Sequence, residues 1–419
     1  MESIKIMPKE EGIEQGLNLV REGYMFIPNR VLSFQSKIFE TRLLGETAIC
    51  MSGEEATRLF YDNSKFTRKD AAPKRALKTL LGEGGVQTLE GQEHLQRKAM
   101  FIKAMNPASL NMMRRILVRE WEAALDTWII KGRINIYKES KKMLMRAICR
   151  WAGVPVIKNE VKLWSQKMAD MYEKPLTVGL EQRQSRKARR QAEAWIKKMI
   201  IEVRNNQLRP LKGSVLYEFS WHRDIDGNLL DEQIVAVEVL NILRPTVAVS
   251  IYISFLALSL YHYPKEKEKV SSRREKDFEM FVQEVRRFYP FFPFNGARVK
   301  EDFIWNGYEF KKDTLTLIDF YGTNHDSEIW ESPNIFNPER FSNWDENPYT
   351  LIPQGGGHYH TGHRCPGEWM TKDIMKISLD YLANQITYDV PAQDISYSLV
   401  SIPTWPKSGF VMDNIRRKR

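Results

Sequence analysis

The longest apolar segment of the chain, VAVEVLNILRPTVAVSIYISFLALSLYHY at residues 235–263, restricts the possible fold more than any other feature. Its uninterrupted apolar part, residues 246–261, is shorter than the roughly 20 residues that a helix needs to cross a bilayer. We therefore expect a helix buried in a large core. The chain has 419 residues, of which 42% are hydrophobic, and these are sufficient to build such a core.

Two residues in the middle of this segment, Arg244 and Pro245, conflict with a purely structural role. A buried guanidinium is costly unless an anion satisfies it. The proline removes one backbone hydrogen bond and opens the helix locally, at a cost of about 3 kcal/mol. Either Arg244 forms a buried salt bridge with Asp or Glu, or it binds a carboxylate ligand in an apolar cavity. The planar guanidinium suits bidentate carboxylate binding.

The stretch IPQGGGHYHTGHRCPGEWM, residues 352–370, contains the most concentrated chemistry. It brings His358, His360, His363 and Cys365 into one glycine-rich loop. A lone cysteine is often only a buried apolar residue. The histidines and the cysteine also suggest zinc, although four ligands within eight residues lack the paired spacing of structural zinc sites. A third interpretation is a haem-binding loop with Cys365 as the axial ligand of the iron.

The position of Cys365 favours its thiolate form. The pattern after it predicts a helix, with Met370, Ile374 and Ile377 on one apolar face. The free N–H groups and positive dipole end of a helix favour an anion there, and Arg364 adds a positive charge. Such a thiolate can be a nucleophile, a redox group or a metal ligand. The choice among these three roles requires the other motifs of the chain.

Composition and charge narrow the class of protein. The three cysteines, Cys50, Cys149 and Cys365, form no disulfide framework and suit a reducing compartment. The first residues lack the apolar run of a signal peptide. We find no linker or repeat, and we predict one domain over 1–419, soluble and cytoplasmic, without an integral membrane segment.

The net charge of +10 raises the question of nucleic acid. Basic residues concentrate at 183–191 and 416–419, but no aromatic residues or nucleic-acid motif accompany them. We interpret these clusters as solvated surface, with attraction to an anionic substrate or surface as the alternative, and we expect no nucleic-acid partner.

Other charged residues occur at helical spacing. His94, Arg97 and Lys98 share one face of a predicted helix, which we expect to face solvent unless an anionic cofactor edge covers it. Glu284 and Arg287 are three residues apart in an otherwise apolar helix, which an aromatic–proline run ends. A loop carrying Arg340 follows at residues 332–341.

The order of these motifs resembles the cytochrome P-450 superfamily over nearly the whole chain. It comprises a Glu-x-x-Arg helix, strands, a Pro-Glu-Arg-Phe loop, a glycine-rich cysteine loop and a long helix. The segments FYGTNHDSEIW, FNPERF, LIPQGGG, HRCPGEW and NILRP resemble the bacterial fatty-acid peroxygenases within it. The resemblance implies a mainly α fold with a small β lobe and a haem b between two long helices.

The resemblance also assigns roles to residues. Cys365 is implied as the iron ligand, with Arg68, His94 and His363 at the haem propionates. Glu284, Arg287 and Arg340 match a structural charge triad. The residues implied in catalysis are Arg244, Pro245 and Gln87, and those implied in the substrate pocket are Leu81, Phe291 and Phe292.

The implied reaction is the oxidation of long- or medium-chain free fatty acids by hydrogen peroxide, with no dedicated reductase. Arg244–Pro245 replaces the acid or amide and threonine with which monooxygenases deliver protons, so a substrate carboxylate held by Arg244 serves as acid and base.

Gln87 stands where olefin-forming members carry histidine, so we expect mainly α- and β-hydroxylation. Leu81 stands where these enzymes often have phenylalanine. The alternatives are decarboxylation to terminal alkenes, a reductase-fed monooxygenase, and a zinc-binding interaction module without enzymatic activity.

Overall fold

The computed structural model describes residues 4–174 and 179–418. The helices are α1 (Gly16–Glu22), α2 (Phe26–Phe34), α3 (Glu54–Phe60), α4 (Lys74–Ala76), α5 (Gly91–Ala104), α6 (Pro107–Lys131), α7 (Ile136–Ala152), α8 (Val161–Glu173), α9 (Leu180–Arg204), α10 (Val215–Ser220), α11 (Glu232–Ala248), α12 (Ser250–His262), α13 (Pro264–Val270), α14 (Glu275–Phe288), α15 (Phe320–Asn324) and α16 (Glu368–Asp380). The strands are β1 (Ile38–Leu43), β2 (Glu46–Met51), β3 (Phe66–Thr67), β4 (Arg133–Asn135), β5 (Phe294–Val299), β6 (Phe303–Trp305), β7 (Tyr308–Phe310), β8 (Leu315–Asp319), β9 (Ile386–Asp389) and β10 (Val411–Arg417).

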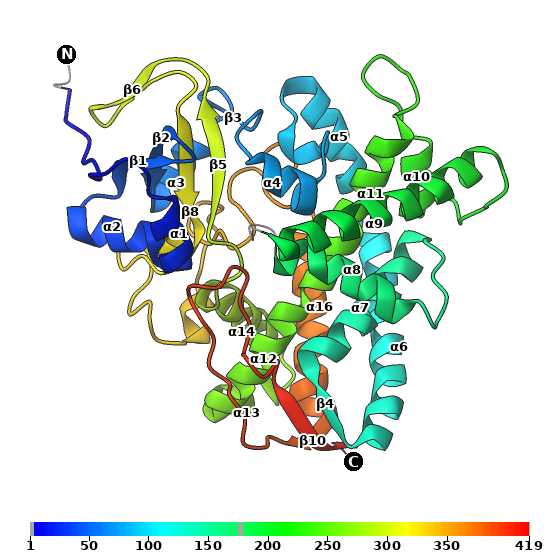
Figure 1. The fold of residues 1–419 in the computed structure, drawn as a ribbon. Coiled ribbons are helices and arrows are strands. Elements are labelled where there is room, and N and C mark those ends of the chain that lie inside the picture. The colour runs from blue at the N-terminus through cyan, green and yellow to red at the C-terminus, as the bar shows by residue number, and fades with distance from the viewer. Residues whose placement is uncertain (1–3, 175–178, 419) are drawn as a thin grey trace.

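The strands and the long helices occupy different parts of the molecule. Figure 1 shows β1, β2, β5 and β8 on one side, with α1 and α2 against them, and the helical part on the other. The main sheet has the order β1-β2-β8-β5-β3, and only its β2–β8 pair is parallel. Small sheets, β4-β10-β9 and β6-β7, complete the β structure. The prediction of a mainly α fold with a small β lobe is confirmed.

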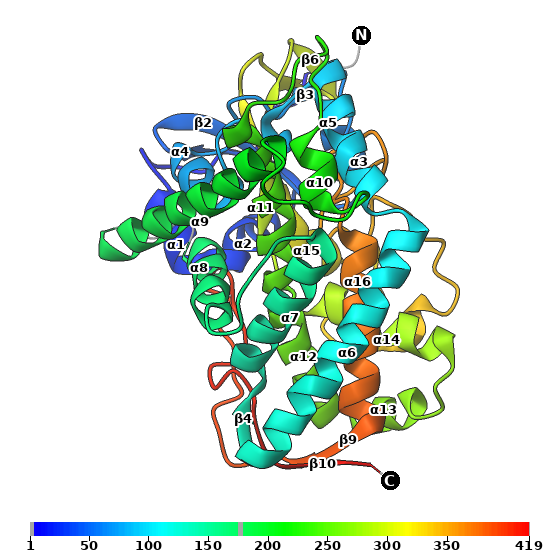
Figure 2. The same cartoon turned by 90° about the vertical axis from the view of Figure 1, so that its right-hand side faces the viewer.

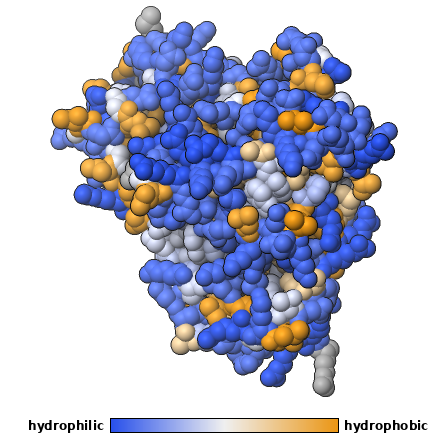
Figure 3. Space-filling view, turned by 45° about the vertical axis from the view of Figure 1, so that its right-hand side comes forward, coloured by the Kyte–Doolittle hydropathy of each residue, from blue (hydrophilic) through white to orange (hydrophobic). Residues whose placement is uncertain are grey.

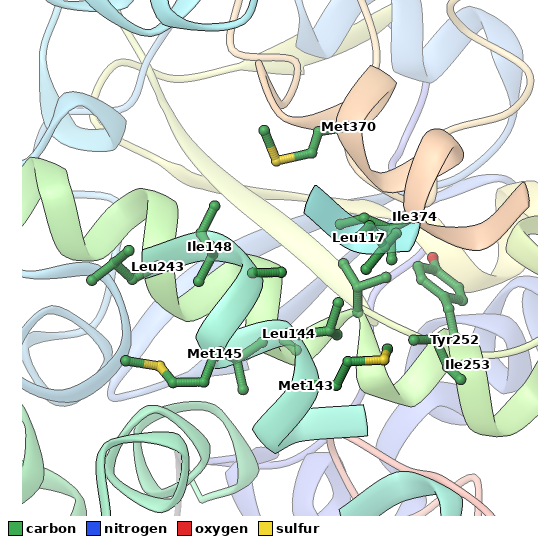
Figure 4. Close-up of a cluster of buried hydrophobic side chains, with 14 of the residues drawn as sticks. Leu117, Met143, Leu144, Met145, Ile148, Leu243, Tyr252, Ile253, Met370 and Ile374 are labelled. Atoms are coloured by element: carbon green, nitrogen blue, oxygen red, sulfur yellow. The ribbon is translucent and has the colours of Figure 1, made fainter. Parts of the chain in front are cut away.

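The largest hydrophobic cluster lies among the long helices. Figure 2 shows α6, α7, α12 and α16 running alongside one another below the site region. Figure 4 shows side chains of these helices and of α11 meeting, with Leu144, Leu243 and Met370 among them. The surface in Figure 3 is mostly hydrophilic, with apolar residues in small, separated groups. The burial of apolar area in this cluster is therefore the main stabilising contribution to the helical part.

The segment that restricts the fold most forms α11 and α12, which meet at Val249. Asp231 caps α11 by accepting hydrogen bonds from the backbone N–H groups of Gln233 and Ile234. The combined helix is long and apolar enough to cross a membrane, but most of it is buried inside the protein. The prediction of a buried helix is confirmed, and α11 carries Arg244 into the centre of the molecule.

Two turns place the remaining site elements. Pro290 follows α14, and the chain then enters β5 of the main sheet. Later, the glycine-rich loop passes from Leu351 to α16 and returns close to α3, because a Cβ atom on Gly357 would lie 2.9 Å from Cβ of Tyr61. The cysteine loop is therefore held between the β region and the long helices.

Candidate active site

Cys365 lies in the loop before α16, and its side chain is half-buried. Its backbone N–H donates to the carbonyl of Gln354 at 3.2 Å, and Nε2 of Gln354 lies 3.9 Å from Sγ. The N–H of Gly367 also donates to the sulfur. The loop therefore directs two N–H donors at the cysteine sulfur, as suits a residue that binds a metal as a thiolate.

The helix start and Arg364 were expected to favour the thiolate of Cys365, but burial outweighs such effects. Burial raises the pKa of the Cys365 thiol above its usual value. The Gly367 N–H group and the positive charges of Lys98 and Arg286 lower this pKa, and Glu368 raises it, but burial dominates. A metal cation at the sulfur would reverse this balance, because coordination deprotonates a thiol.

Two arginines hold Glu368, the first residue of α16. Arg286 donates to Oε1 at 2.5 Å and Arg364 to Oε2 at 2.6 Å. Burial alone would raise the pKa of this carboxyl, but the guanidinium groups lower it to about 2. Arg286 also donates to Oε1 of Gln354 at 3.2 Å, which leaves the amide nitrogen of Gln354 to face Cys365. A network of ion pairs and hydrogen bonds therefore positions the donor at the sulfur.

The predicted charge triad is brought together. Nε and Nη2 of Arg287 donate to the two carboxylate oxygens of Glu284 at 2.7 and 2.8 Å, a bidentate pair. Nε of Arg340 lies 3.1 Å from Oε2 of Glu284. The backbone N–H of Asn337 donates to the same carboxylate at 2.7 Å. Because Glu284 and Arg287 are fully buried, this cluster fixes α14 to the loop of residues 332–341.

The three residues implied at the propionates also gather. The rings of His94 and His363 stack with centroids 4.0 Å apart. Arg68 is 3% exposed and donates through Nη2 to the carbonyl of Phe60 at 3.0 Å, whereas its Nε and Nη1 atoms are buried without a partner. Burial and neighbouring cations lower the pKa of His94 to about 4 and that of Arg68, by burial, to about 10.

The expectation that the helix face of His94, Arg97 and Lys98 is exposed is wrong. His94 and Lys98 are buried, and Nζ of Lys98 donates to the carbonyls of Gly362 and Arg364, the second at 2.6 Å. Nη1 of Arg97 binds Glu238 at 2.9 Å. The cysteine loop covers this face, so the cations lie inside the site.

This arrangement fits a dianionic planar cofactor with a metal at Cys365. Arg68 has unpartnered donors for an anionic group, and the hydroxyl of Tyr61 is also buried without a partner. A Cβ atom on Gly355 would lie 2.9 Å from that hydroxyl, so a larger residue would close the space. No group of three or more His, Cys, Asp or Glu side chains that could hold a metal occurs in the described residues, which disfavours the zinc interpretation.

Arg244 of α11 has no side-chain partner among the described residues. Its side chain is 5% exposed, and within residues 4–174 and 179–418 it makes no hydrogen bond or ion pair. Burial and the nearby charge of Arg189 lower its pKa to about 9, and the thiol of Cys365 acts in the opposite direction. The interpretation of Arg244 as half of a buried salt bridge is therefore wrong for the described residues.

Gln87, in the turn of residues 86–88, is hydrogen-bonded to the helix that carries Arg244. Its Oε1 accepts from Nδ2 of Asn241 at 3.3 Å, and Asn241 also donates to Glu238 at 2.9 Å. Sequence reasoning missed Glu238 and Asn241. A signal was present, because both are polar residues in an apolar helix and precede Arg244 at intervals of three residues.

The residues implied in the substrate pocket differ in their exposure to solvent. Leu81 is half-buried and packs against the main core, and Phe291 stacks on Tyr252 with centroids 4.4 Å apart. Phe291 is partly buried, whereas Phe292 is 42% exposed. Arg189, from the basic cluster at 183–191, is buried and binds Glu193 at 2.5 Å, so this cluster is not wholly solvated.

Sequence reasoning also missed Arg286, Gln354 and Glu368. Arg286 is adjacent to Arg287 in the sequence, but no local pattern shows that it turns toward α16 and not toward the triad. The partners of these residues are 68 to 82 positions apart, so only the folded structure brings them together.

Comparison with known proteins places this geometry in a family. The cytochrome P450 family model matches residues 278–394. The solved structure of cytochrome P450EX alpha (CYP152N1) with myristic acid is 51% identical, covers 99% of this chain and 100% of its own, and superposes with a TM-score of 0.96. Cytochrome P450SP alpha (CYP152B1) in complex with (R)-ibuprophen is 40% identical, with 97% and 99% coverage and a TM-score of 0.94.

Two proteins of lower sequence identity are also similar to this chain. A variant of cytochrome P450 OleT in complex with arachidonic acid is 35% identical, covers 99% of each chain and has a TM-score of 0.96. Abscisic acid 8'-hydroxylase 1 of Arabidopsis thaliana is 23% identical over 423 residues, which is 88% of this chain and 84% of that protein. Proteins of this superfamily hold haem through a cysteine thiolate. The chain belongs to the cytochrome P450 superfamily and, within it, to the CYP152 family of bacterial fatty-acid peroxygenases.

Proposed function

We propose that this protein oxidises free fatty acids with hydrogen peroxide and forms mainly α- and β-hydroxy acids. The observation that carries this proposal is Arg244, a buried guanidinium that has no partner among the described residues. A carboxylate is the ligand that such a group binds best. Relatives support the substrate class, since P450EX alpha was solved with myristic acid and the OleT variant with arachidonic acid.

The cofactor in this proposal is haem b. Cys365 would bind its iron, and Arg68, His94 and His363 would hold its propionates. When bound, haem supplies the chemistry that cleaves the oxygen–oxygen bond of peroxide. Because imidazoles of low pKa are neutral at pH 7, His94 would act as a hydrogen-bonding group, while Arg68 supplies the positive charge.

The protein residues perform the positioning. Arg244 binds the substrate carboxylate by charge-assisted hydrogen bonds and keeps it in a buried site that excludes water. The bound carboxylate then accepts a proton from peroxide and returns it to the departing oxygen, as general base and acid. Pro245 has no hydroxyl group, so the residue after the arginine does not compete for this proton transfer. Overall, R–H and H₂O₂ give R–OH and H₂O.

The product is assigned from Gln87. An amide stays neutral and does not donate a proton as an acid, so it does not assist the departure of carbon dioxide from an oxidised substrate. Hydroxylation is therefore the favoured outcome, and decarboxylation to a terminal alkene is the second candidate. The similarity to OleT, at 35% identity, is the reason for retaining this second candidate.

The test is product analysis of the haem-loaded protein with peroxide and myristic acid, without reductase or NAD(P)H. Hydroxy acids should appear in the wild type and disappear in Arg244→Leu. The same substitution at an exposed arginine of α9, Arg190→Leu, controls for loss of positive charge. Turnover only with a reductase system would overturn the peroxygenase assignment, and mainly terminal alkene would overturn the product assignment.

A further inference from the structure

A chain of hydrogen bonds through Asn241 and Glu238 of α11 fixes the side chain of Gln87. Nδ2 of Asn241 donates to Oε1 of Gln87 at 3.3 Å and to Oε2 of Glu238 at 2.9 Å. The other carboxylate oxygen of Glu238 accepts from the backbone N–H of Val86 at 2.8 Å and from Nη1 of Arg97 at 2.9 Å. Three donors, from Val86, from Arg97 of α5 and from Asn241 of α11, thus meet around one buried carboxylate, and Asn241 links it to Gln87.

The donors and acceptors of this chain allow one orientation. Glu238 is fully buried, and burial raises the pKa of its carboxyl, whereas Arg97, Asn241 and the Val86 N–H group lower it. Both oxygens of this carboxyl act as acceptors, since Oε1 accepts from Val86 and Arg97 and Oε2 accepts from Asn241. Asn241 must therefore turn its NH₂ group toward Glu238, and the same NH₂ group reaches Gln87. Gln87 must accept this hydrogen bond with its oxygen. Its own NH₂ group has no partner among the described residues and can therefore donate to a ligand. Reversing the Gln87 amide would set two donors against each other.

Gly85 provides the space for this arrangement. A Cβ atom at this position would lie 2.9 Å from Oε1 of Gln87 and 3.1 Å from Nδ2 of Asn241, so it would push between the two amides. The φ of Gly85 is −73°, which every residue adopts readily. The requirement for glycine here is therefore spatial. Alanine would separate the two amides while it preserves every polar group.

We propose that Asn241, held by Glu238, is a positioning residue that fixes the Gln87 amide with its NH₂ group presented to the substrate carboxylate beside Arg244. Asn241 precedes Arg244 by three residues, about one turn of α11. A carboxylate held by two donors has a defined rotation, and this rotation sets which carbon lies nearest the reacting centre. The inference rests on the proposed function and adds a determinant of its regioselectivity.

The experiment is a double-mutant cycle on the haem-loaded enzyme. Asn241→Leu and Gly85→Ala are each made in the wild type and in Gln87→Leu. The readouts are the ratio of α- to β-hydroxy product from myristic acid and peroxide, and the Kd for myristic acid from the haem absorbance change. In the wild-type background, each substitution should change the product ratio by about threefold or more and weaken binding by less than about tenfold. In Gln87→Leu, neither should change the ratio further.

Thr88→Ala is the matched control, because Oγ1 of Thr88 donates to the carbonyl of Gly85 at 2.9 Å without joining the chain of amides. It should leave the product ratio unchanged. Equal effects of Asn241→Leu with and without Gln87 would show a general structural role and overturn the inference, as would no effect in either background. If the wild type binds myristic acid without oxidising it, only the proposed function is overturned. The double-mutant cycle is then evaluated from the Kd values for myristic acid of the same variants. A wild type that does neither overturns both.

Discussion

The buried arginines on the two sides of the candidate active site differ in whether they have a partner within the protein. On the side of Cys365, Arg287 has a bidentate carboxylate partner and Arg286 binds both Glu368 and Gln354. On the other side, Arg244 is also buried, but its side chain makes no hydrogen bond or ion pair with the described residues. Burial of an unpaired charge costs stability, whereas a paired one is largely compensated. The paired arginines therefore support the structure, and the unpaired one is available to a ligand.

The largest effect is expected at the paired side. Glu284→Ala leaves Arg287 and Arg340 without their shared carboxylate, and it should lower the free energy of unfolding by about 3–5 kcal/mol. Urea denaturation of the haem-loaded protein measures this loss. Glu339→Ala removes a half-exposed carboxylate that pairs with Lys269, and it should cost no more than about 1 kcal/mol. Similar losses for both variants would contradict the structural role of the triad.

Arg244→Leu should affect ligand affinity strongly and stability little, the reverse of Glu284→Ala. The substitution removes a buried cation without a partner, so stability should stay the same or rise. Affinity for a fatty acid should fall by about 10²–10³-fold, which corresponds to the loss of roughly 3–5 kcal/mol when one partner of a buried pair is removed. Titration with myristic acid measures the affinity, and thermal melting of the same samples measures the stability. Unchanged affinity would place the carboxylate elsewhere.

The lowered pKa of Arg244 predicts a smaller effect, on pH dependence. A cation with a folded-state pKa of about 9 loses its charge as pH rises through 9, so carboxylate binding should weaken about tenfold per pH unit above that value. The unfolded chain keeps this proton to a much higher pH, so the same group makes folding more favourable as pH rises above about 9. Titrations with myristic acid from pH 7 to 10 test the binding, with Arg244→Lys as the comparison. A flat profile would show that Arg244 stays charged throughout.

The smallest effect concerns the product. Gln87→His introduces an ionisable group in place of the amide and should raise the terminal-alkene fraction a few-fold, with affinity little changed because Arg244 still holds the carboxylate. Mass spectrometry of the products measures the ratio. Gln87→Leu has no proton to give and should show no such rise. An equal alkene fraction in all three proteins would separate the product choice from this position.

Sequence alone predicted the features that depend on local pattern. The buried helix at 235–263, the cysteine loop before α16 and the Glu284–Arg287 pair follow from periodicity and spacing. The residues alone left open whether Arg244 pairs with a protein carboxylate or binds a carboxylate ligand, because the answer depends on every segment packed around α11. The structure decides this point, since Arg244 has no partner among the described residues. The burial of His94 and Lys98 was missed for the same reason, since the cysteine loop that covers them lies more than 260 residues away.

The helix pair α11–α12 also has a consequence for biosynthesis. It is the segment of the described chain that a translocating channel could mistake for a membrane anchor. The helices α7, α8 and α9 contact α11, and all three precede it in the sequence. Ribosomes release the chain from its N-terminus, so these three helices have already emerged when the apolar segment appears. The order of elements along the chain thus allows α11 to be covered as it is made, whereas α12 also contacts α13, α14 and α16, which are made later.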